Sequence, residues 1–491
     1  MASDFTIGAA VAAPLAKPRA RRLGLTVLIA LVVGSMIGGG VFSLPQNMSK
    51  GAGPAAILIG WLITGVGMLA LAFVYQRLSM RKPELDSGPY AYARAGFGDF
   101  VGFNAAWGYW LSAWIGNVSY AVLIFGALGH FFPMFGTGNT LPAIVGASIC
   151  LWLIHALILM GVREAAIANV VTTIAKLVPI IIFIVAVLIA FRLDTFTLDV
   201  WGAGTPNLGS ITEQVKSTML VTLWVFIGIE GASVVSARAA KREDIGRATI
   251  LGFGTALIAY MLVSLLALGV MTQPELAELP DTASMADVLG QVAGPWGDLL
   301  IRVGLVISVA GAFLTWTLFA AEIPFVAARD GDMPAFFGKE NGRGSPASAL
   351  WITNILVQAF LLLTFYSEST YTALFYIAST AILVPYVLSG GYALKLAMTG
   401  ETYSSGEWRG QDMLIGAVAT IYGLWLIYAA GPAYLLMCAL LYVPGIIFYV
   451  WTKRERGETL FRPFEALLAL GLIVAAGIAG WMMWTGAISP L

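Results

Sequence analysis

The amino-acid sequence predicts an all-α polytopic membrane protein, and this prediction rests on its composition and on the grouping of its apolar residues. Of the 491 residues, 59% are hydrophobic and 11% are charged, whereas a soluble globular protein has about 25% charged residues. The apolar residues are gathered into long segments, and a helix of about 20 such residues crosses a bilayer. The formal net charge is zero, so attraction of the whole chain to nucleic acid is not indicated.

Thirteen segments are long and apolar enough to be membrane spans. They cover approximately residues 23–49, 53–76, 98–131, 140–160, 165–191, 214–237, 247–271, 297–327, 347–367, 371–397, 413–430, 432–452 and 464–485. Only the short stretch Ala429-Ala430-Gly431-Pro432 separates the eleventh span from the twelfth. We expect residues 1–22 to form a polar cytoplasmic tail and residues 23–491 to form a single transmembrane domain.

The distribution of basic residues predicts the orientation. Of the 27 Lys and Arg residues, 22 lie in the N-terminal tail and in the loops expected on the same side of the membrane. Cytoplasmic loops carry an excess of Lys and Arg, so the N-terminus is expected in the cytoplasm and, after thirteen spans, the C-terminus outside it. The outer loop 272–298 has five acidic residues and no Lys or Arg. This loop is either simply solvated or a vestibule that attracts cations.

Motifs of common enzyme, metal and nucleotide sites are absent from the sequence. It contains no HExxH, CxxC, GxSxG or GxxxxGK[ST] pattern, and it has only two histidines and two cysteines. We therefore expect no cofactor, no metal and no enzymatic activity. A channel is also disfavoured, because interrupted helices with scattered charges suit a binding site better than a continuous pore.

Glycines interrupt two of the spans near their middle. Span 1 contains Gly34-Ser35-Met36-Ile37-Gly38-Gly39-Gly40, and span 6 contains Phe226-Ile227-Gly228-Ile229-Glu230-Gly231. Each glycine destabilises a helix interior by about 1 kcal/mol relative to alanine. Because the breaks lie five spans apart, we predict a LeuT-like 5+5 inverted repeat with discontinuous helices 1 and 6. Repeat 1 would cover about 23–191, repeat 2 about 214–397, and additional helices about 413–485.

The chemistry of the two breaks suits the two charged groups of an amino acid. An interrupted helix frees N–H groups on one half and carbonyls on the other, and these must face a cavity or a partner. The N–H end attracts a carboxylate, and Gly39 and Gly40 let it approach the backbone closely. Carbonyls near Trp224 and Ile227 suit an ammonium group. The alternative is that these glycines only allow close helix packing.

Four segments resemble the amino acid–polyamine–organocation superfamily. They read GSMIGGGVFSLP (34–45), GPYAYAR (88–94), YWLSAWIGN (109–117) and FIGIEGASVVSARA (226–239). The likeness covers residues from about 20 to 455 and is greatest to the basic amino acid/polyamine antiporters, in particular the arginine/ornithine and lysine exchangers.

This resemblance implies exchange of basic amino acids by alternating access in a bacterial inner membrane. The implied partners are cationic amino acids and the lipid bilayer, with a homodimer as an open alternative for assembly. Proton-coupled amino acid symport, or amino acid/amine exchange, by the same fold is the alternative function.

The resemblance also implies which residues bind substrate. The candidates are Ser35, Met36, Gly39 and Gly40 in span 1, Tyr109 and Asn117 in span 3, Trp224 and Ile227 in span 6, and Trp316 in span 8. The contact serine of related exchangers falls on Gly39, so a hydroxyl contact is lost there. Trp224 and Trp316 would stack on a cation, although tryptophans in membrane proteins often anchor at the lipid interface. Tyr109 could instead be a packed aromatic residue.

Three ionisable residues lie inside spans: Lys176, Glu230 and Glu322. Such residues are costly in a membrane and indicate function by default, with charge pairing as the alternative. Glu230 would attract a cationic substrate and lose that attraction on protonation. By resemblance to sodium-independent relatives, Lys176 would supply a positive charge, the alternative being a lysine satisfied by carbonyls. Glu322 would meet the distal cation of the substrate or line its path, or else pair with Lys176 or an inner-loop arginine.

Overall fold

The computed structural model describes residues 23–85, 88–366 and 371–488, and within these ranges the chain is helical without a β-strand. The predicted tail 1–22 lies outside the described residues. The first described residue, Leu23, forms an isolated bridge with Ala239. The prediction of an all-α protein is confirmed for this part of the chain.

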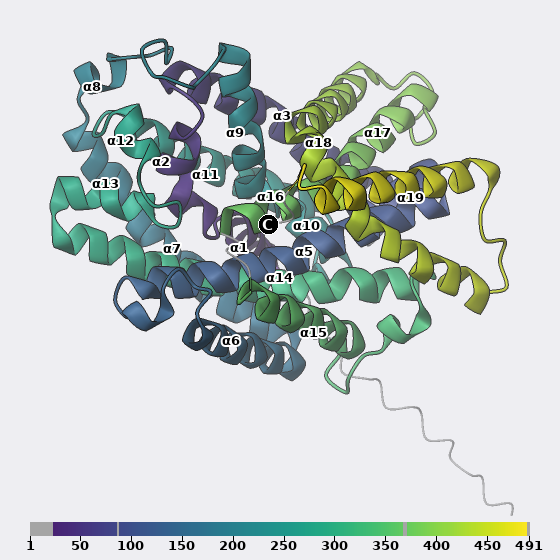
Figure 1. Ribbon diagram of the computed structural model, residues 1–491. Helices are drawn as coiled ribbons and strands as arrows, with labels where there is room; N and C mark the ends of the chain where they lie inside the picture. The colour runs from purple at the N-terminus through teal and green to yellow at the C-terminus, as the bar shows by residue number, and fades with distance from the viewer. Residues whose placement is uncertain (1–22, 86–87, 367–370, 489–491) are drawn as a thin grey trace, which may run out of the picture.

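The helices follow one another in the order drawn in Figure 1. The first half of the chain forms α1 (Leu25–Met36), α2 (Gly40–Ser49), α3 (Pro54–Arg81), α4 (Pro89–Phe97), α5 (Asp99–Gly129), η1 (Pro133–Phe135), α6 (Leu141–Met160), α7 (Val162–Ala190), α8 (Leu193–Thr197), α9 (Ile211–Phe226), α10 (Gly231–Val234) and η2 (Ser236–Arg238). The second half forms α11 (Glu243–Ala267), α12 (Gln273–Ala277), α13 (Ser284–Ala293), α14 (Pro295–Arg329), η3 (Ala335–Gly338), α15 (Ala347–Thr364), α16 (Tyr371–Ala381), α17 (Leu383–Thr399), α18 (Gly410–Glu455) and α19 (Pro463–Trp484).

Both predicted helix breaks are present. In span 1, α1 ends at Met36 and α2 begins at Gly40. In span 6, α9 ends at Phe226 and only the four-residue helix α10 follows. Gly228 between them has a φ of 109°, a conformation that glycine adopts without the penalty of a side chain.

Eleven helical segments in the described ranges are long and apolar enough to cross a membrane, with α1 and α2 counted as one segment and α16 and α17 as another. They correspond to the predicted spans except in two places. The helix of span 6 is cut short at its break, and α18 contains both the eleventh and the twelfth predicted spans. Within α18, Gly431 has non-helical angles of φ 78° and ψ 164°, and Pro432 follows it. The count of thirteen spans and the inverted repeat therefore stay predictions.

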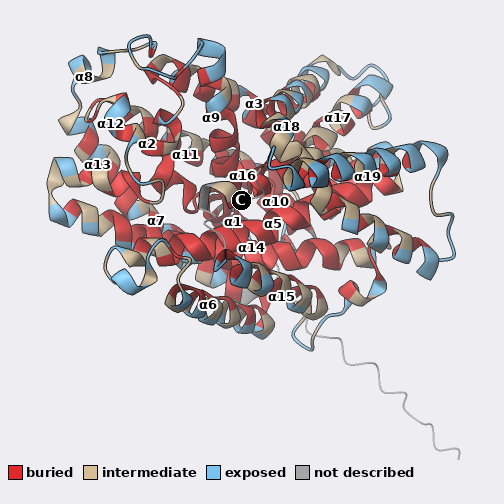
Figure 2. Cartoon of the chain, in the orientation of Figure 1, coloured by how far each residue is buried: buried red, intermediate tan, exposed pale blue. Residues whose placement is uncertain are grey.

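The centre of the molecule is built on α5 and α14, which pack side by side across the middle of Figure 1. Figure 2 shows α5 buried along most of its length. In contrast, α19 exposes apolar side chains such as Leu467 and Leu470. Exposed apolar side chains on a helix of spanning length are expected where the helix faces lipid. The two breaks, in contrast to α19, lie in the buried part of the molecule, where Ser35 and Glu230 are fully buried.

The loop between α11 and α14 is fastened to α2. The Ser43 hydroxyl donates to the Thr282 carbonyl at 3.2 Å. The Gln46 amide donates to the Ser284 hydroxyl at 3.1 Å, and α12, α13 and α2 lie together at one end of the molecule in Figure 1. These hydrogen bonds fix the position of the half-helix that begins at the first break.

Candidate functional site

The two helix breaks touch each other. The Ser35 hydroxyl lies 3.0 Å from the Gly228 carbonyl oxygen, to which it donates, and 2.9 Å from the Val32 carbonyl oxygen of its own helix. A Cβ atom on Gly228 would lie 2.5 Å from the Ser35 hydroxyl oxygen. Glycine at position 228 therefore permits both the positive φ and the close approach of the two chains.

Lys176 on α7 binds the carbonyl end of α1. Its ammonium nitrogen donates to the Gly34 carbonyl at 3.0 Å and to the Ile37 carbonyl at 2.6 Å, and the side chain is fully buried. A cation is favourable at a helix C-terminus, where unpaired carbonyls carry negative partial charge. The structure thus places Lys176 in the carbonyl-bound arrangement and joins it to the first break.

Two residues of α14 hold the same carbonyl end from another side. The Trp316 indole nitrogen donates to the Ser35 carbonyl at 3.1 Å. The Ser308 hydroxyl donates to the Gly38 carbonyl at 2.9 Å. The Met36 carbonyl accepts from the Gly38 amide at 2.9 Å. The carbonyl groups that the break releases are therefore bound by protein donors.

The amide end of the first break is open. Among the described residues, no acceptor bonds the amides of Gly39 and Gly40, which stand at the start of the ten-residue helix α2. On the second break, the Ile227 carbonyl accepts no hydrogen bond from the described part of the chain. The site thus offers donors for an anionic group and an acceptor for a cationic group, as expected for the two ends of an amino acid.

Glu230 sits just after the second break and is fully buried. The Tyr109 hydroxyl donates to one carboxylate oxygen, and the Tyr386 hydroxyl donates to the other at 2.5 Å. These tyrosines come from α5 and α17, so the carboxylate joins three predicted spans. Hydrogen bonding of this kind is what makes a buried carboxylate tolerable.

Both candidate tryptophans lie inside the protein and not at its lipid-facing surface. Trp224 is 6% exposed and Trp316 is 3% exposed. Trp224 stacks on Phe375 with ring centres 5.5 Å apart, and Trp316 stacks on Tyr109 with ring centres 6.1 Å apart. An anchoring role at the membrane interface is therefore wrong for these two residues.

Asn117 is buried on α5, and only the nitrogen of its side-chain amide has a hydrogen-bond partner among the described residues. Its side-chain nitrogen donates to the Thr317 hydroxyl at 3.2 Å. Its side-chain oxygen is buried and has no hydrogen-bond partner in the ranges that the structure describes. A buried oxygen without a donor is rare in native proteins, so Asn117 has an acceptor available for a ligand.

Glu322 is paired with an arginine. The Arg238 guanidinium binds both carboxylate oxygens, with Nε–Oε1 at 2.9 Å and Nη2–Oε2 at 3.0 Å. The Arg238 carbonyl also accepts from the Leu23 amide at 2.8 Å. The structure thus places Glu322 in the arginine-paired arrangement, which ties α14 to η2 and to the start of span 1.

Comparison with known proteins shows which family the chain belongs to. The sequence profile described as "Amino acid permease" matches residues 23–453. An arginine/ornithine antiporter of Pseudomonas aeruginosa is 52% identical over 479 residues, which are 96% of this chain and 99% of that protein. The chain belongs to the amino acid permease family. The matched range contains both breaks and every candidate site residue of the permease.

Two further relatives extend this comparison. An L-lysine transport protein of Corynebacterium glutamicum is 44% identical to the permease over 478 residues, covering 94% of this chain and 95% of that protein. An arginine/agmatine antiporter of Chlamydia caviae is 44% identical over 465 residues, covering 92% and 96% of the two chains. The resemblance inferred from the four motifs is confirmed.

Sequence reasoning missed several residues of the site in this permease. Tyr386 and Ser308 bind Glu230 and the first break from α17 and α14, and Tyr120 lies beside Gly38. For Tyr386, the available signal was its place after Pro385 in span 10. No local pattern distinguishes Tyr120 or Ser308, because each acts through a contact with a distant part of the chain.

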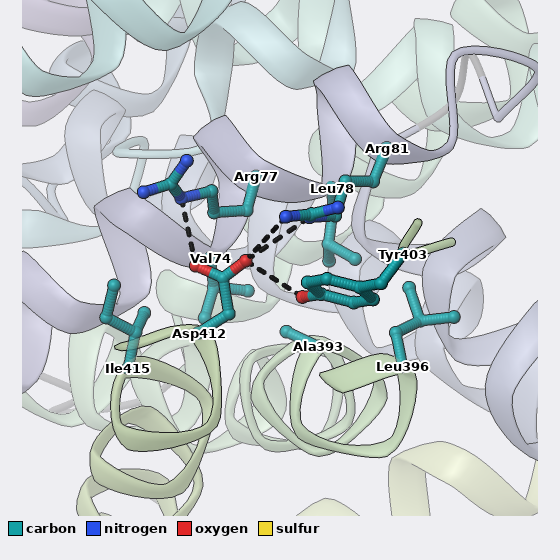
Figure 3. A pocket seen from close by; sticks show the side chains of 9 residues that line it. All are labelled: Val74, Arg77, Leu78, Arg81, Ala393, Leu396, Tyr403, Asp412 and Ile415. Carbon is teal, nitrogen blue, oxygen red and sulfur yellow. Dashed lines mark hydrogen bonds and ion pairs between the residues drawn. The ribbon is translucent and has the colours of Figure 1, made fainter. Parts of the chain in front are cut away.

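A small cavity of the permease lies away from this site, between α3, α17 and α18. Figure 3 shows Arg77 and Arg81 on one side of it and Asp412 on the other. Asp412 pairs with Arg77 at 3.1 Å and with Arg81 at 3.0 Å, and it accepts from the Tyr403 hydroxyl at 2.8 Å. Burial, together with this hydrogen bond, raises the pKa of Tyr403 to about 12. These contacts fasten the ends of three helices and do not reach the breaks.

Proposed function

We propose that this permease exchanges basic amino acids of the arginine, ornithine or lysine class by alternating access. The observation that carries the proposal is the contact between the two breaks at Ser35 and Gly228. Open amides on one break and the open Ile227 carbonyl on the other match the carboxylate and ammonium groups of an amino acid. The names of the three relatives, which include arginine, ornithine, lysine and agmatine, support the cationic class.

The side chain of the substrate would meet the aromatic and acidic part of the site. Trp224 and Trp316 offer ring faces to a cation, and Glu230 offers the opposite charge. Because Glu230 is bound by Tyr109 and Tyr386, passage past this point requires α5, α17 and the second break to separate. Release of these two hydroxyls would therefore be part of the transition between the two open states.

Exchange and proton-coupled symport make different use of the buried charges. In exchange, the loaded carrier reorients and the empty one does not. In symport, Lys176 or Glu230 would carry the proton. The direct bonds from Lys176 to the Gly34 and Ile37 carbonyls support a role in holding the first break, whichever coupling applies.

Counterflow in proteoliposomes tests the proposal. Vesicles preloaded with arginine, ornithine or lysine should take up labelled arginine much faster than empty vesicles, and a proton gradient alone should drive little uptake. Uptake that follows the proton gradient and ignores internal amino acids would overturn exchange in favour of symport. Competition by neutral amino acids as strong as by arginine would overturn the cationic substrate class.

The proposal includes a setting in the membrane. We place the N-terminus in the cytoplasm and the C-terminus outside it, in a bacterial inner membrane, with residues 23–491 as one domain. The support is the concentration of Lys and Arg in one set of loops. A homodimer is an open alternative for the assembly. Accessibility of single cysteines placed near each terminus to a membrane-impermeant thiol reagent tests the orientation.

A further inference from the structure

Two residues of α5 fill the space beside the glycines of the first break. A Cβ atom on Gly38 would lie 3.0 Å from the Tyr120 hydroxyl oxygen. A Cβ atom on Gly39 would lie 2.1 Å from Cδ2 of Leu123. Residues three apart lie on the same face of a helix, so α5 presents both side chains to the break together. Tyr120 and Leu123 of span 3 therefore occupy the space that side chains at positions 38 and 39 would take.

The Tyr120 hydroxyl is held at the break without a protein partner. The side chain is 5% exposed, and its ring packs on Trp224 with ring centres 5.6 Å apart. Within the described ranges, no residue makes a hydrogen bond to its hydroxyl. A buried tyrosine hydroxyl usually finds a partner. The ring is therefore fixed by packing while the hydroxyl faces the break with its hydrogen-bonding capacity unused.

The hydroxyl lies beside Gly38, and the next two residues of the chain carry amides that suit an anion. The amides of Gly39 and Gly40 are open and stand at the N-terminus of α2, where the partial charge is positive. The carbonyls of the preceding turn are already occupied by Lys176, Ser308 and Trp316. A ligand group that approaches Tyr120 here meets hydrogen-bond donors, so a carboxylate fits better than an ammonium group.

We propose that the Tyr120 hydroxyl donates a hydrogen bond to the α-carboxylate of the substrate, beside the amides of Gly39 and Gly40. The inference rests on the proposed function, and it makes Tyr120 a residue that selects substrates with a free carboxylate. A hydrogen bond to an ionised carboxylate is stronger than one between neutral groups. The bond would supply, from span 3, the hydroxyl contact that a glycine at position 39 cannot provide.

The variant Tyr120→Phe tests this contact because it keeps the ring and removes only the hydroxyl. Inhibition of labelled arginine uptake is measured with unlabelled arginine, arginine methyl ester and agmatine, the last two lacking the free carboxylate. The affinity for arginine should fall about tenfold to a hundredfold, while the affinities for the ester and the amine stay within about twofold of wild type. Tyr449→Phe is the matched control, since the Tyr449 hydroxyl is buried without a partner among the described residues and its ring packs on Phe100 and Phe103, not on Trp224.

Two results would overturn the proposal: unchanged affinity for arginine in the Tyr120→Phe variant, or equal weakening of all three ligands. If this variant does not transport, thermal stabilisation of the purified protein by arginine and by agmatine gives the same comparison. Loss of stabilisation by arginine alone supports the contact, and equal retention or loss for both ligands overturns it. Failure of the proposed function would be seen separately, as the absence of cationic amino acid exchange by the wild-type protein. If wild type accepts neutral amino acids instead, the same test is run with that amino acid and its ester.

Discussion

The hydroxyl of Ser35 donates to the carbonyl of Gly228 across 3.0 Å, so the interrupted parts of spans 1 and 6 are in direct contact. The two residues are 193 positions apart in the chain. If one break moves relative to the other, the hydrogen bond between Ser35 and Gly228 must break. It is one of the contacts that join the two predicted repeats, beside the packing of α5 and α7 against α14.

The variants Ser35→Ala and Gly228→Ala, which alter the two sides of this contact, should destabilise the protein by different amounts. Ser35→Ala loses one hydrogen bond and should destabilise the protein by about 1 kcal/mol. Gly228→Ala adds a Cβ 2.5 Å from the Ser35 hydroxyl oxygen at a φ of 109°, and should cost about 1–3 kcal/mol from backbone strain alone. Thermal unfolding in detergent measures both variants. The control is Gly254→Ala on α11, where an added Cβ would meet nothing within 4 Å. Equal stability of Gly228→Ala and wild type would contradict the expected result.

Glu230→Gln should impair uptake of cationic substrates without preventing membrane insertion. The substitution keeps the size of the side chain but removes the charge, and it changes the bonds to Tyr109 and Tyr386. Hydrogen bonds to charged groups contribute about 1.5–3 kcal/mol, so uptake at low arginine concentration should fall about tenfold or more. Glu84→Gln, at an exposed position, is the control. Wild-type uptake by Glu230→Gln would remove Glu230 from the substrate site.

Trp316 offers both an aromatic face and an indole N–H, and two substitutions can separate their contributions. Trp316→Phe keeps an aromatic face but loses the N–H that donates to the Ser35 carbonyl, whereas Trp316→Ala loses both. If the ring holds the substrate cation, the alanine variant should lose more arginine affinity than the phenylalanine variant, by about 0.5–2 kcal/mol. Competition binding with arginine and with a neutral amino acid measures the difference. Equal losses for the two variants would assign Trp316 to holding the break alone.

Asp332 lies outside the membrane-spanning helices, and its carboxyl group makes the stability of the protein depend on pH. Burial raises the pKa of Asp332 to about 7, and the nearby carboxylates of Asp99 and Asp330 act in the same direction. Arg94, which pairs with Asp332 at 3.0 Å, and Lys453 lower this pKa but do not outweigh burial. A carboxyl group whose pKa is higher in the folded state binds more protons there, so it reduces stability as the pH rises from about 4 to about 7.

Asp332→Asn should therefore lose less stability than wild type between pH 5 and pH 8. The other titrating groups are common to both proteins, so the difference between their two pH profiles isolates this carboxyl group. Unfolding midpoints measured across this range in detergent provide the comparison. Parallel profiles for the two proteins would show that Asp332 does not titrate there.

The breaks were predictable from sequence because their cause is local. Clusters of glycine at Gly38–Gly40 and around Gly228 interrupt apolar segments, and each glycine in a helix interior lowers helix stability by about 1 kcal/mol, which favours a break there. The partners of the intramembrane charges were not predictable in the same way. Glu230 and Tyr386 are 156 residues apart, and whether Glu322 meets Lys176 or an arginine depends on how the helices pack. The boundary inside α18, in contrast, has a local cause, because Gly431 has non-helical angles and Pro432 follows it.

Gly39→Ser examines whether the space beside the first break limits the choice of residue. A Cβ at position 39 would lie 2.1 Å from Cδ2 of Leu123, a contact that requires the α5 side chain to move. Overpacking of this kind costs about 1–3 kcal/mol, so the single variant should be less stable than wild type and bind arginine more weakly. Adding Leu123→Ala removes the clash and should restore part of the arginine affinity, because the serine then supplies a donor beside the Gly39 amide. Leu123→Ala alone is the control for the cavity it creates. If the double variant binds arginine no better than Gly39→Ser alone, the clash with Leu123 is not what excludes a serine from this position.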